Sequence, residues 1–426
     1  MTLAIFTGTL LAVIALGGPI AYALIITGAA LMWQMGLFDG QIIAQNILNS
    51  VDNFPMIAVP LFILAGEIMN TGGLSRRIIH LAQCLVGHRR GGLGFVVIFA
   101  GLLLSSLSGS ALADAASLSA LLLPMMVAAG HSKERAGGLI ASSAIIAPII
   151  PPSIGFIVFG VATNLSISKL FMAGIAPGIM IAVSLAVTWY FIARTEDVEQ
   201  PDAVTWGETG RALFDSLWAL MLPVIIIVGL RFGIVTPTEA AAVAAMYALF
   251  VAMFIYRELS IADLSELIFR AGKTSAGVMF LVAAAAVPAW MINIADIPGQ
   301  IIGLVEPFID NPKLLVFVLM LLIILVGTAM DLTPTILLLG PILVPVVQAA
   351  GVDPIYFGVL FMINCAIGLI TPPVGTVLNV VCAVGKMDYG ALVRGSFPFF
   401  LAETAVLFLL VLFPELVTVP AAWISG

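Results

Sequence analysis

Charged residues are scarce in this sequence. They make up 9% of the 426 residues, while hydrophobic residues make up 62%. Soluble globular domains carry about 25% charged residues, because their surfaces face water. A soluble fold of this length is therefore excluded, and lipid must replace water over most of the exterior.

Residues that bind metals or act as catalysts are also few. The chain holds three His and three Cys, and the cysteines (Cys84, Cys365 and Cys382) show no paired or ligand-like spacing. It contains no GxxxxGKS/T loop, no HExxH and no Ser/His/Asp arrangement. We therefore expect no enzyme activity, no cofactor and no nucleic-acid partner, which also disfavours a membrane-embedded enzyme or respiratory subunit. The energy for any transport must come from an ion gradient or from another subunit.

Long apolar segments rich in Leu, Ile, Ala and Val dominate what is present. They predict transmembrane helices, since the alternating pattern of a membrane β-barrel is absent. Basic residues at 76–77, 89–90 and 133–135 mark cytoplasmic loops. An acidic loop on the opposite face holds Asp296, Glu306 and Asp310. The N-terminus lacks a basic region and a cleavage site, so we expect the mature chain to begin at Met1.

The two halves of the chain resemble one another. Pro124–Gly130 is similar to Pro345–Gly351, and Ile149–Gly155 is similar to Leu369–Gly375. Each half is predicted to contain spans, a re-entrant hairpin, a broken helix and a final span. With five crossings per half the second half is inverted, as in secondary transporters. Leu3–Trp33 could instead form one kinked helix of about 46 Å, but symmetry favours two crossings.

Two Pro-Pro pairs interrupt apolar segments, Pro151-Pro152 and Pro372-Pro373. Proline removes a backbone donor and disfavours helix at the preceding residue, so each pair predicts an unwound point. Carbonyls freed in hydrocarbon must be coordinated. The predicted hairpin tips, Ser108-Gly109-Ser110 and Gly327-Thr328, should face these breaks.

Oxygen atoms around such a break form a small cage that suits Na⁺, and nearby helix N-termini suit a carboxylate. Side-chain oxygens would come from Ser153, Thr371, Thr376 and Asn379. The structural alternative is a proline kink with Ser and Thr bonded to their own backbone. Two pairs at equivalent repeat positions favour the site.

Two aspartates, Asp114 and Asp331, each follow a hairpin tip and should lie near membrane depth. Ionised groups there are usually functional. Asp331 also precedes Thr333-Pro334, which fits a helix N-cap. Both interpretations of Asp331, as a cap and as support for an ion site, remain open.

Several sequence strings resemble one transporter family: PLFILAGEIMNTGGLSRRI (60–78), SLSGSALADAASL (106–118), APIIPPS (147–153), GIVTPTEAAAVAAMYALF (233–250) and GLITPPVGTVLNV (368–380). The chain resembles the large membrane subunit of tripartite ATP-independent periplasmic (TRAP) transporters, DctM-like, over essentially its whole length. This resemblance implies an all-α polytopic membrane protein with an inverted repeat, two re-entrant hairpins, two broken helices and an elevator-type ion-transporter fold. The protein would reside in the bacterial inner membrane.

The resemblance also implies a division into scaffold and transport regions. The first repeat would comprise scaffold helices (1–53) and a transport region (54–193) with hairpin one (about 93–129) and a broken helix (138–163). A cytoplasmic linker (194–216) would lead to the second repeat. That repeat would comprise scaffold helices (217–273) and a transport region (274–426) with hairpin two (about 314–350), a broken helix (355–384) and a last span.

The function implied is import of a small organic acid, such as a C4-dicarboxylate, a sugar acid or sialic acid, driven by a Na⁺ gradient. Partners would be a periplasmic substrate-binding protein and a small four-helix membrane subunit. We expect the small subunit to be a separate chain, since no extra four-helix block flanks the matched region. The alternative is a binding-protein-independent secondary carrier for organic anions.

Carried onto matching positions, the family's sites place Na⁺ at two sets of residues. Ion-binding residues would be Ser108, Gly109, Ser110, Pro152 and Ser153 in one half, and Gly327, Thr328, Thr371, Gly375 and Thr376 in the other. The solute would sit between the tips, and its expected ligands are Ser110, Asp114, Ser153, Thr328, Asp331 and Asn379.

Overall fold

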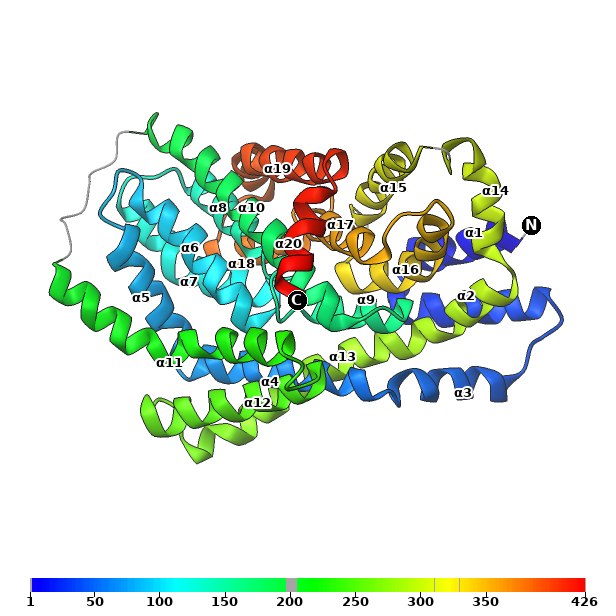
Figure 1. The fold of residues 1–426 in the computed structure, drawn as a ribbon, viewed down its shortest axis with the longest axis horizontal. Coiled ribbons are helices and arrows are strands. Elements are labelled where there is room, and N and C mark those ends of the chain that lie inside the picture. Colours follow the sequence, from blue (N-terminus) through cyan, green and yellow to red (C-terminus); the bar gives the residue numbers. More distant parts are fainter. Residues whose placement is uncertain (1, 197–204, 310, 329, 426) are drawn as a thin grey trace.

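The computed structural model describes residues 2–196, 205–309, 311–328 and 330–425, and all regular elements in these ranges are helices (Figure 1). Eight described helices are long and apolar enough to cross a membrane. The predicted all-α polytopic membrane fold is thereby confirmed. Asp310 of the predicted acidic loop and residues 197–204 of the predicted linker lie outside the described residues, as does the side chain of Glu306.

The first half opens with two short helices packed against each other, α1 (Thr2–Ala15) and α2 (Ile20–Gln34). Gly17 has φ +80° and Pro19 precedes α2, so the chain turns between them. The alternative of one kinked helix over this segment is therefore wrong. Next come α3 (Gly40–Val51), the short 3₁₀ helix η1 (Phe54–Ile57), α4 (Ala58–Thr71) and the amphipathic α5 (Leu74–Val86).

Each half contains a helical hairpin followed by a broken helix. Hairpin one is α6 (Gly92–Ser108) with α7 (Ala111–Ala128), and hairpin two is α15 (Pro312–Gly327) with α16 (Leu332–Ala349). The second arms are both 18 residues long. The broken helices are α8 (Lys133–Ala144) with α9 (Ile154–Thr163), and α17 (Pro354–Gly368) with α18 (Thr376–Gly385). Both Pro-Pro pairs lie in the breaks, as predicted.

The remaining helices complete the two halves. They are α10 (Ile167–Ala193), α11 (Trp206–Arg231), α12 (Pro237–Phe250) with the π-helical turn η2 (Val251–Ile255), α13 (Ile261–Ile294), α14 (Ile297–Ile309), α19 (Tyr389–Leu412) and α20 (Glu415–Ser425). Helix α11 begins at Trp206, so the segment between α10 and α11 ends before the predicted boundary at residue 216. A Thr205–Glu208 capping box starts this helix early.

Helix α13 runs unbroken for 34 residues, so the predicted division at residues 273 and 274 falls inside one helix. The corresponding segment of the first half is divided into two helices, α3 and α4. Asp52, Asn53 and Pro55 lie between them. Helix α4 packs mainly on α12 and α13, although the predicted division groups it with the transport region. The observed scaffold group therefore contains α2, α4, α12 and α13.

The hairpins and broken helices pack crosswise. Helix α7 packs against α18, and α16 packs against α9, so each hairpin contacts the broken helix of the other half (Figure 1). Helix α8 packs against α19, and α10 against α20. We call α6–α10 and α15–α20 the transport group. Such packing between the two halves is expected when two inverted repeats intertwine.

Contacts near the helix ends agree with the predicted inversion. Arg76 and Arg77 of the basic loop both pair with Glu258, which lies between α12 and α13, at 2.5 Å. Lys133 Nζ donates to the Lys386 carbonyl at 3.2 Å. On the other face, Lys313 Nζ donates to the Leu412 carbonyl at 3.0 Å. Residues assigned to one face by loop charge thus meet one another.

Candidate functional site

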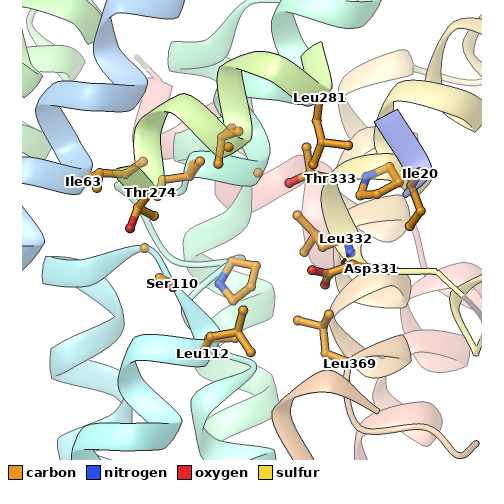
Figure 2. Close-up of a pocket in the computed structure, with 18 residues that line it drawn as sticks. Ile20, Ile63, Ser110, Leu112, Thr274, Leu281, Asp331, Leu332, Thr333 and Leu369 are labelled. Atoms are coloured by element: carbon orange, nitrogen blue, oxygen red, sulfur yellow. Dashed lines mark hydrogen bonds between the residues drawn. The ribbon is translucent and has the colours of Figure 1, made fainter. Parts of the chain in front are cut away.

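A cavity of about 430 Å³ lies between the two hairpin tips and helix α13 (Figure 2). Ser110 of hairpin one and Asp331 of hairpin two lie on facing walls, while Thr274 and Leu281 of α13 line a further wall. Pro148 and Leu369 from the two breaks complete its floor. The cavity therefore sits where the two repeats and the scaffold meet.

First-turn residues of four helices line this cavity. They are Ile20 of α2, Ala111 of α7, Ile154 of α9 and Leu332 of α16. Unpaired backbone N–H groups and the helix dipole give such ends a partial positive charge. The described lining residues include no Lys, Arg or His, and Asp331 is the one acid among them. An anion at this site would therefore be held by helix ends, by hydroxyl groups or by a bound cation, and not by a basic side chain.

The tip of hairpin one is organised by Asp114. The buried carboxylate accepts a hydrogen bond of 2.6 Å from the Ser108 hydroxyl, which in turn accepts the Ser110 N–H at 3.2 Å. The other Asp114 oxygen, Oδ2, has no protein partner. Asp114 therefore shapes the tip from inside the hairpin and is not among the residues that line the cavity, so its role as a solute ligand stays a prediction.

The first tip touches the first break. Gly109 has φ +59°, and a side chain there would collide with the carbonyl oxygen of Pro152. Ser153 caps α9 by accepting the Phe156 N–H, and its hydroxyl donates to the Pro148 carbonyl at 2.6 Å. Tip and break thus form one compact unit, with Ser153 fully buried beside the cavity.

Asp331 caps a helix and also lines the cavity, while its predicted support of an ion site stays a prediction. It is the N-cap residue of α16, and its carboxylate accepts the Leu332 N–H at 2.8 Å. The carboxylate also lines the cavity, and the Thr376 hydroxyl of α18 lies 3.5 Å from Oδ1. Capping fixes the position of the carboxylate, while part of it stays available to a ligand.

The second tip also touches its break, through the close approach of Gly327 and Gly368. The side-chain oxygens expected around it are engaged locally. Thr328 donates to the Leu325 carbonyl and Thr371 to the Ile367 carbonyl, both at 2.7 Å. Asn379 is exposed and donates to the Val374 carbonyl at 2.7 Å.

The predicted residues thus divide into two sets. Gly109, Ser110 and Asp331 line the cavity. The others lie behind the tips or at the breaks: Ser108, Asp114, Pro152, Ser153, Gly327, Thr328, Thr371, Gly375, Thr376 and Asn379. The structure brings each tip to its break, but it does not place Thr328 or Asn379 against the cavity.

The two breaks differ in exposure. Pro151, Pro152 and Ser153 are buried, whereas Pro372, Pro373 and Val374 are exposed. Gly375, which follows, has φ +47° and is the N-cap residue of α18. The repeats are therefore symmetric in backbone plan and unequal in solvent access.

The wall formed by α13 was not predicted from the sequence. Thr274, Gly277, Val278 and Leu281 all line the cavity, and so does Thr333 of α16. The sequence did contain one indication of this wall, because the small residues at 274–277 lie at the start of an apolar stretch. Small side chains in a membrane helix permit close approach of another body.

Comparison with known proteins places this arrangement among transporters. The chain matches the family model described as tripartite ATP-independent periplasmic transporter, DctM component, over residues 7–416. It is 53% identical over 425 residues to the 2,3-diketo-L-gulonate TRAP transporter large permease protein of Escherichia coli, covering 100% of both chains. It is 38% identical over 399 residues to the sialic acid TRAP transporter large permease protein of Vibrio cholerae, covering 94% of this chain and 93% of that protein.

A solved structure shares the fold. The crystal structure of the YdaH transporter from Alcanivorax borkumensis matches with a TM-score of 0.67 and covers 92% of this chain and 91% of that one. Sequence identity in this comparison is 14%, so the similarity concerns the fold alone.

Proposed function

The chain belongs to the DctM-component family of tripartite ATP-independent periplasmic transporters, and from this premise we propose that it is the membrane subunit of a Na⁺-driven importer of a small organic acid. As a large permease it is a multi-pass inner-membrane protein and not an enzyme. The observation that carries the proposal is the cavity between the hairpin tips, because both repeats and the scaffold contribute to it.

Na⁺ coupling is supported by the charges around the cavity. Asp331 faces it, and the described lining residues include no basic side chain. An anionic solute beside this carboxylate would be repelled unless a cation lay between them, since charges in a low-dielectric site interact strongly. Na⁺ bound near the tips would neutralise Asp331 and help to hold the solute carboxylate at the helix N-termini.

Among organic acids, we propose a sugar acid as the solute class. The support is the 53% identity over the full length of a permease named for 2,3-diketo-L-gulonate, compared with 38% for one named for sialic acid. The polyhydroxy body of a sugar acid would also find acceptors and donors at Ser110, Thr274 and Asp331. C4-dicarboxylates and sialic acid are the competing classes for the assay below.

Binding-protein dependence and an elevator motion complete the proposal. A periplasmic binding protein would deliver the solute and a small membrane subunit would support the scaffold. The transport group would then slide along α13, whose wall carries Gly277, Ala285, Ala286 and Ala289. Small side chains on this wall are compatible with sliding contact.

The proposal is tested in proteoliposomes that contain this chain and the small subunit, with the binding protein added outside. We expect uptake of radiolabelled sugar acid only with an inward Na⁺ gradient and the loaded binding protein. Uptake that persists after the gradient is collapsed would contradict the coupling. Uptake without the binding protein would favour the independent carrier.

A further inference from the structure

Helix α19 carries a carboxyl group that the proposed transport site does not use. Glu403 has no exposed surface, and neither of its carboxyl oxygens has a hydrogen-bond partner. It lies about 21 Å along the helix from Tyr389, at 1.5 Å per residue. The group is therefore near the middle of a membrane span and away from the lining of the tip cavity.

Unpartnered hydroxyls accompany this carboxyl. Ser142 and Ser143 of α8 are fully buried, and neither hydroxyl has a partner. Ser142 is close enough to interact with the Glu403 carboxyl, although no well-formed hydrogen bond joins them. Other buried hydroxyls in this fold, such as those of Ser105 and Thr371, bond back to their own helix.

Helices α8 and α19 are closely packed in this region. A side chain on Gly138 of α8 would collide with the backbone at Gly395 and Ser396 of α19. The helices thus meet backbone to backbone one turn before Ser142. Thr404, next to Glu403 on α19, also has an unpartnered hydroxyl.

No described charge balances Glu403. The helices packed against α19 are α8, α10, α15, α17, α18 and α20. Glu134 of α8 interacts with Arg394 near the start of α19. The Lys133 ammonium donates a hydrogen bond to the Lys386 carbonyl, and the Lys313 ammonium donates one to the Leu412 carbonyl. The other ionisable groups on these helices interact elsewhere or lie near helix ends: Arg135, Lys169, Tyr190, Arg194, Tyr356, Cys365, Cys382, Tyr389 and Glu415.

An ionised carboxylate in such a place would be severely destabilising, because it is fully buried and has neither a protein hydrogen-bond partner nor a described counter-ion. Two ligands could neutralise it, a proton or a metal cation. A hard metal cation needs a shell of several oxygens, and helical carbonyls are already bonded within their helices. A protonated carboxyl needs only one hydrogen-bond acceptor, and the Ser142 hydroxyl can be that acceptor.

We propose that Glu403 is a proton-binding site in the transport group, where its protonated carboxyl donates to the Ser142 hydroxyl between α8 and α19. The neutral pair allows the transport group to move through the membrane without carrying an unpaired negative charge. The site is separate from the tip cavity and does not depend on the identity of the solute.

Infrared spectroscopy of the purified full chain in lipid tests the proposal directly. We expect a protonated-carboxyl C=O band at neutral pH that is lost in Glu403→Gln. Since Asp114 is also buried, the comparison is repeated in an Asp114→Asn background, where the remaining band belongs to Glu403. Ser142→Ala should shift the frequency of that band, because the hydrogen-bond acceptor is removed.

The controls separate a proton from Na⁺ and from a merely structural role. Glu415→Gln, at an exposed carboxylate on α20, should leave the band unchanged. Glu403→Gln should keep uptake close to that of the parent, since a neutral hydrogen-bonding side chain replaces a neutral acid. A band that disappears on adding Na⁺ would identify a sodium site, and the absence of the band in the Asp114→Asn protein would show Glu403 ionised. Either result would overturn the proposal.

Discussion

Several buried polar side chains in this molecule are hydrogen-bonded close to their own position in the chain, in contrast to Glu403 and Ser142. Ser108 binds Asp114 inside hairpin one, and Thr371 binds a carbonyl one turn earlier. Asp331 differs, because it caps α16 and still faces the cavity. The capping role and the ligand role of Asp331 can be separated by a substitution that removes the charge and keeps the capping oxygen.

Asp331→Asn makes that separation. Asn caps helices about as well as Asp, so the free energy of unfolding should change by less than about 0.5 kcal/mol. Uptake should nevertheless be lost, because the negative charge that holds a cation beside the solute is gone. The measurements are thermal unfolding in detergent and Na⁺-driven uptake in proteoliposomes.

The matched control is Asp353→Asn. Asp353 caps α17 in the same way, accepting the Ile355 N–H at 2.8 Å, and lies outside the tip cavity. This variant should keep both stability and uptake. If Asp331→Asn transports as well as Asp353→Asn, then Asp331 is only a cap.

At the scale of elements, each half repeats one construction. A hairpin tip with small residues lies against a break made by a Pro-Pro pair, and the second arm of the hairpin packs on the broken helix of the other half. In the first half this contact leaves no space for a side chain at Gly109, whereas a methyl group at Gly327 would lie 3.4 Å from Gly368 Cα.

Gly109→Ala tests the contact between tip and break. The new methyl group would meet the Pro152 carbonyl and would require φ near +59°, so we expect a loss of about 1 kcal/mol or more in stability. Uptake should fall sharply, because the tip must shift away from Pro152. Insertion should persist, since hydropathy is unchanged; it is measured by membrane fractionation.

Gly272→Ala serves as the comparison for this substitution. Nothing lies within 4 Å of a methyl group at this position on α13, so the change should leave uptake intact and slightly favour the helix. Normal uptake by Gly109→Ala would mean that the tip and the break do not need to stay in contact.

The tip cavity lies between the scaffold group and the transport group. A second cavity of about 170 Å³ lies farther along α13, and Val161 of α9 and Ala286 of α13 line it. If the transport group slides, these two residues must separate during each cycle.

Cross-linking Val161→Cys to Ala286→Cys in a cysteine-free background tests the motion. A bifunctional thiol reagent should join them and abolish uptake, and cleavage of the linker should restore it. The expectation follows from gating by rigid-body movement, in which locking the groups traps one state.

A pair within the transport group provides the control. Val127 of α7 and Val384 of α18 line one pocket of about 450 Å³, so Val127→Cys and Val384→Cys can be linked without joining the two groups. Uptake should survive this link. Undiminished uptake after linking Val161 to Ala286 would exclude sliding along α13.

The sequence alone determined the membrane class, the hairpins, the two breaks and the inverted order of the halves. These follow from local properties: hydropathy sets helix type, proline restricts its own backbone, and loop charge orients spans. The two-helix start of the chain was also correctly preferred over one kinked helix, since Gly17 and Pro19 act locally.

Only the tertiary structure decided which side chains share a surface. Asp114 and Asp331 each follow a hairpin tip, yet the first turns into its hairpin and the second faces the cavity. The small residues at 274–277 do not show that α13 lines the cavity, and the position of Glu403 in the sequence does not show that it is buried between α8 and α19. The face that a membrane helix turns toward its neighbours depends on packing between distant segments, and hydropathy is nearly uniform around such a helix.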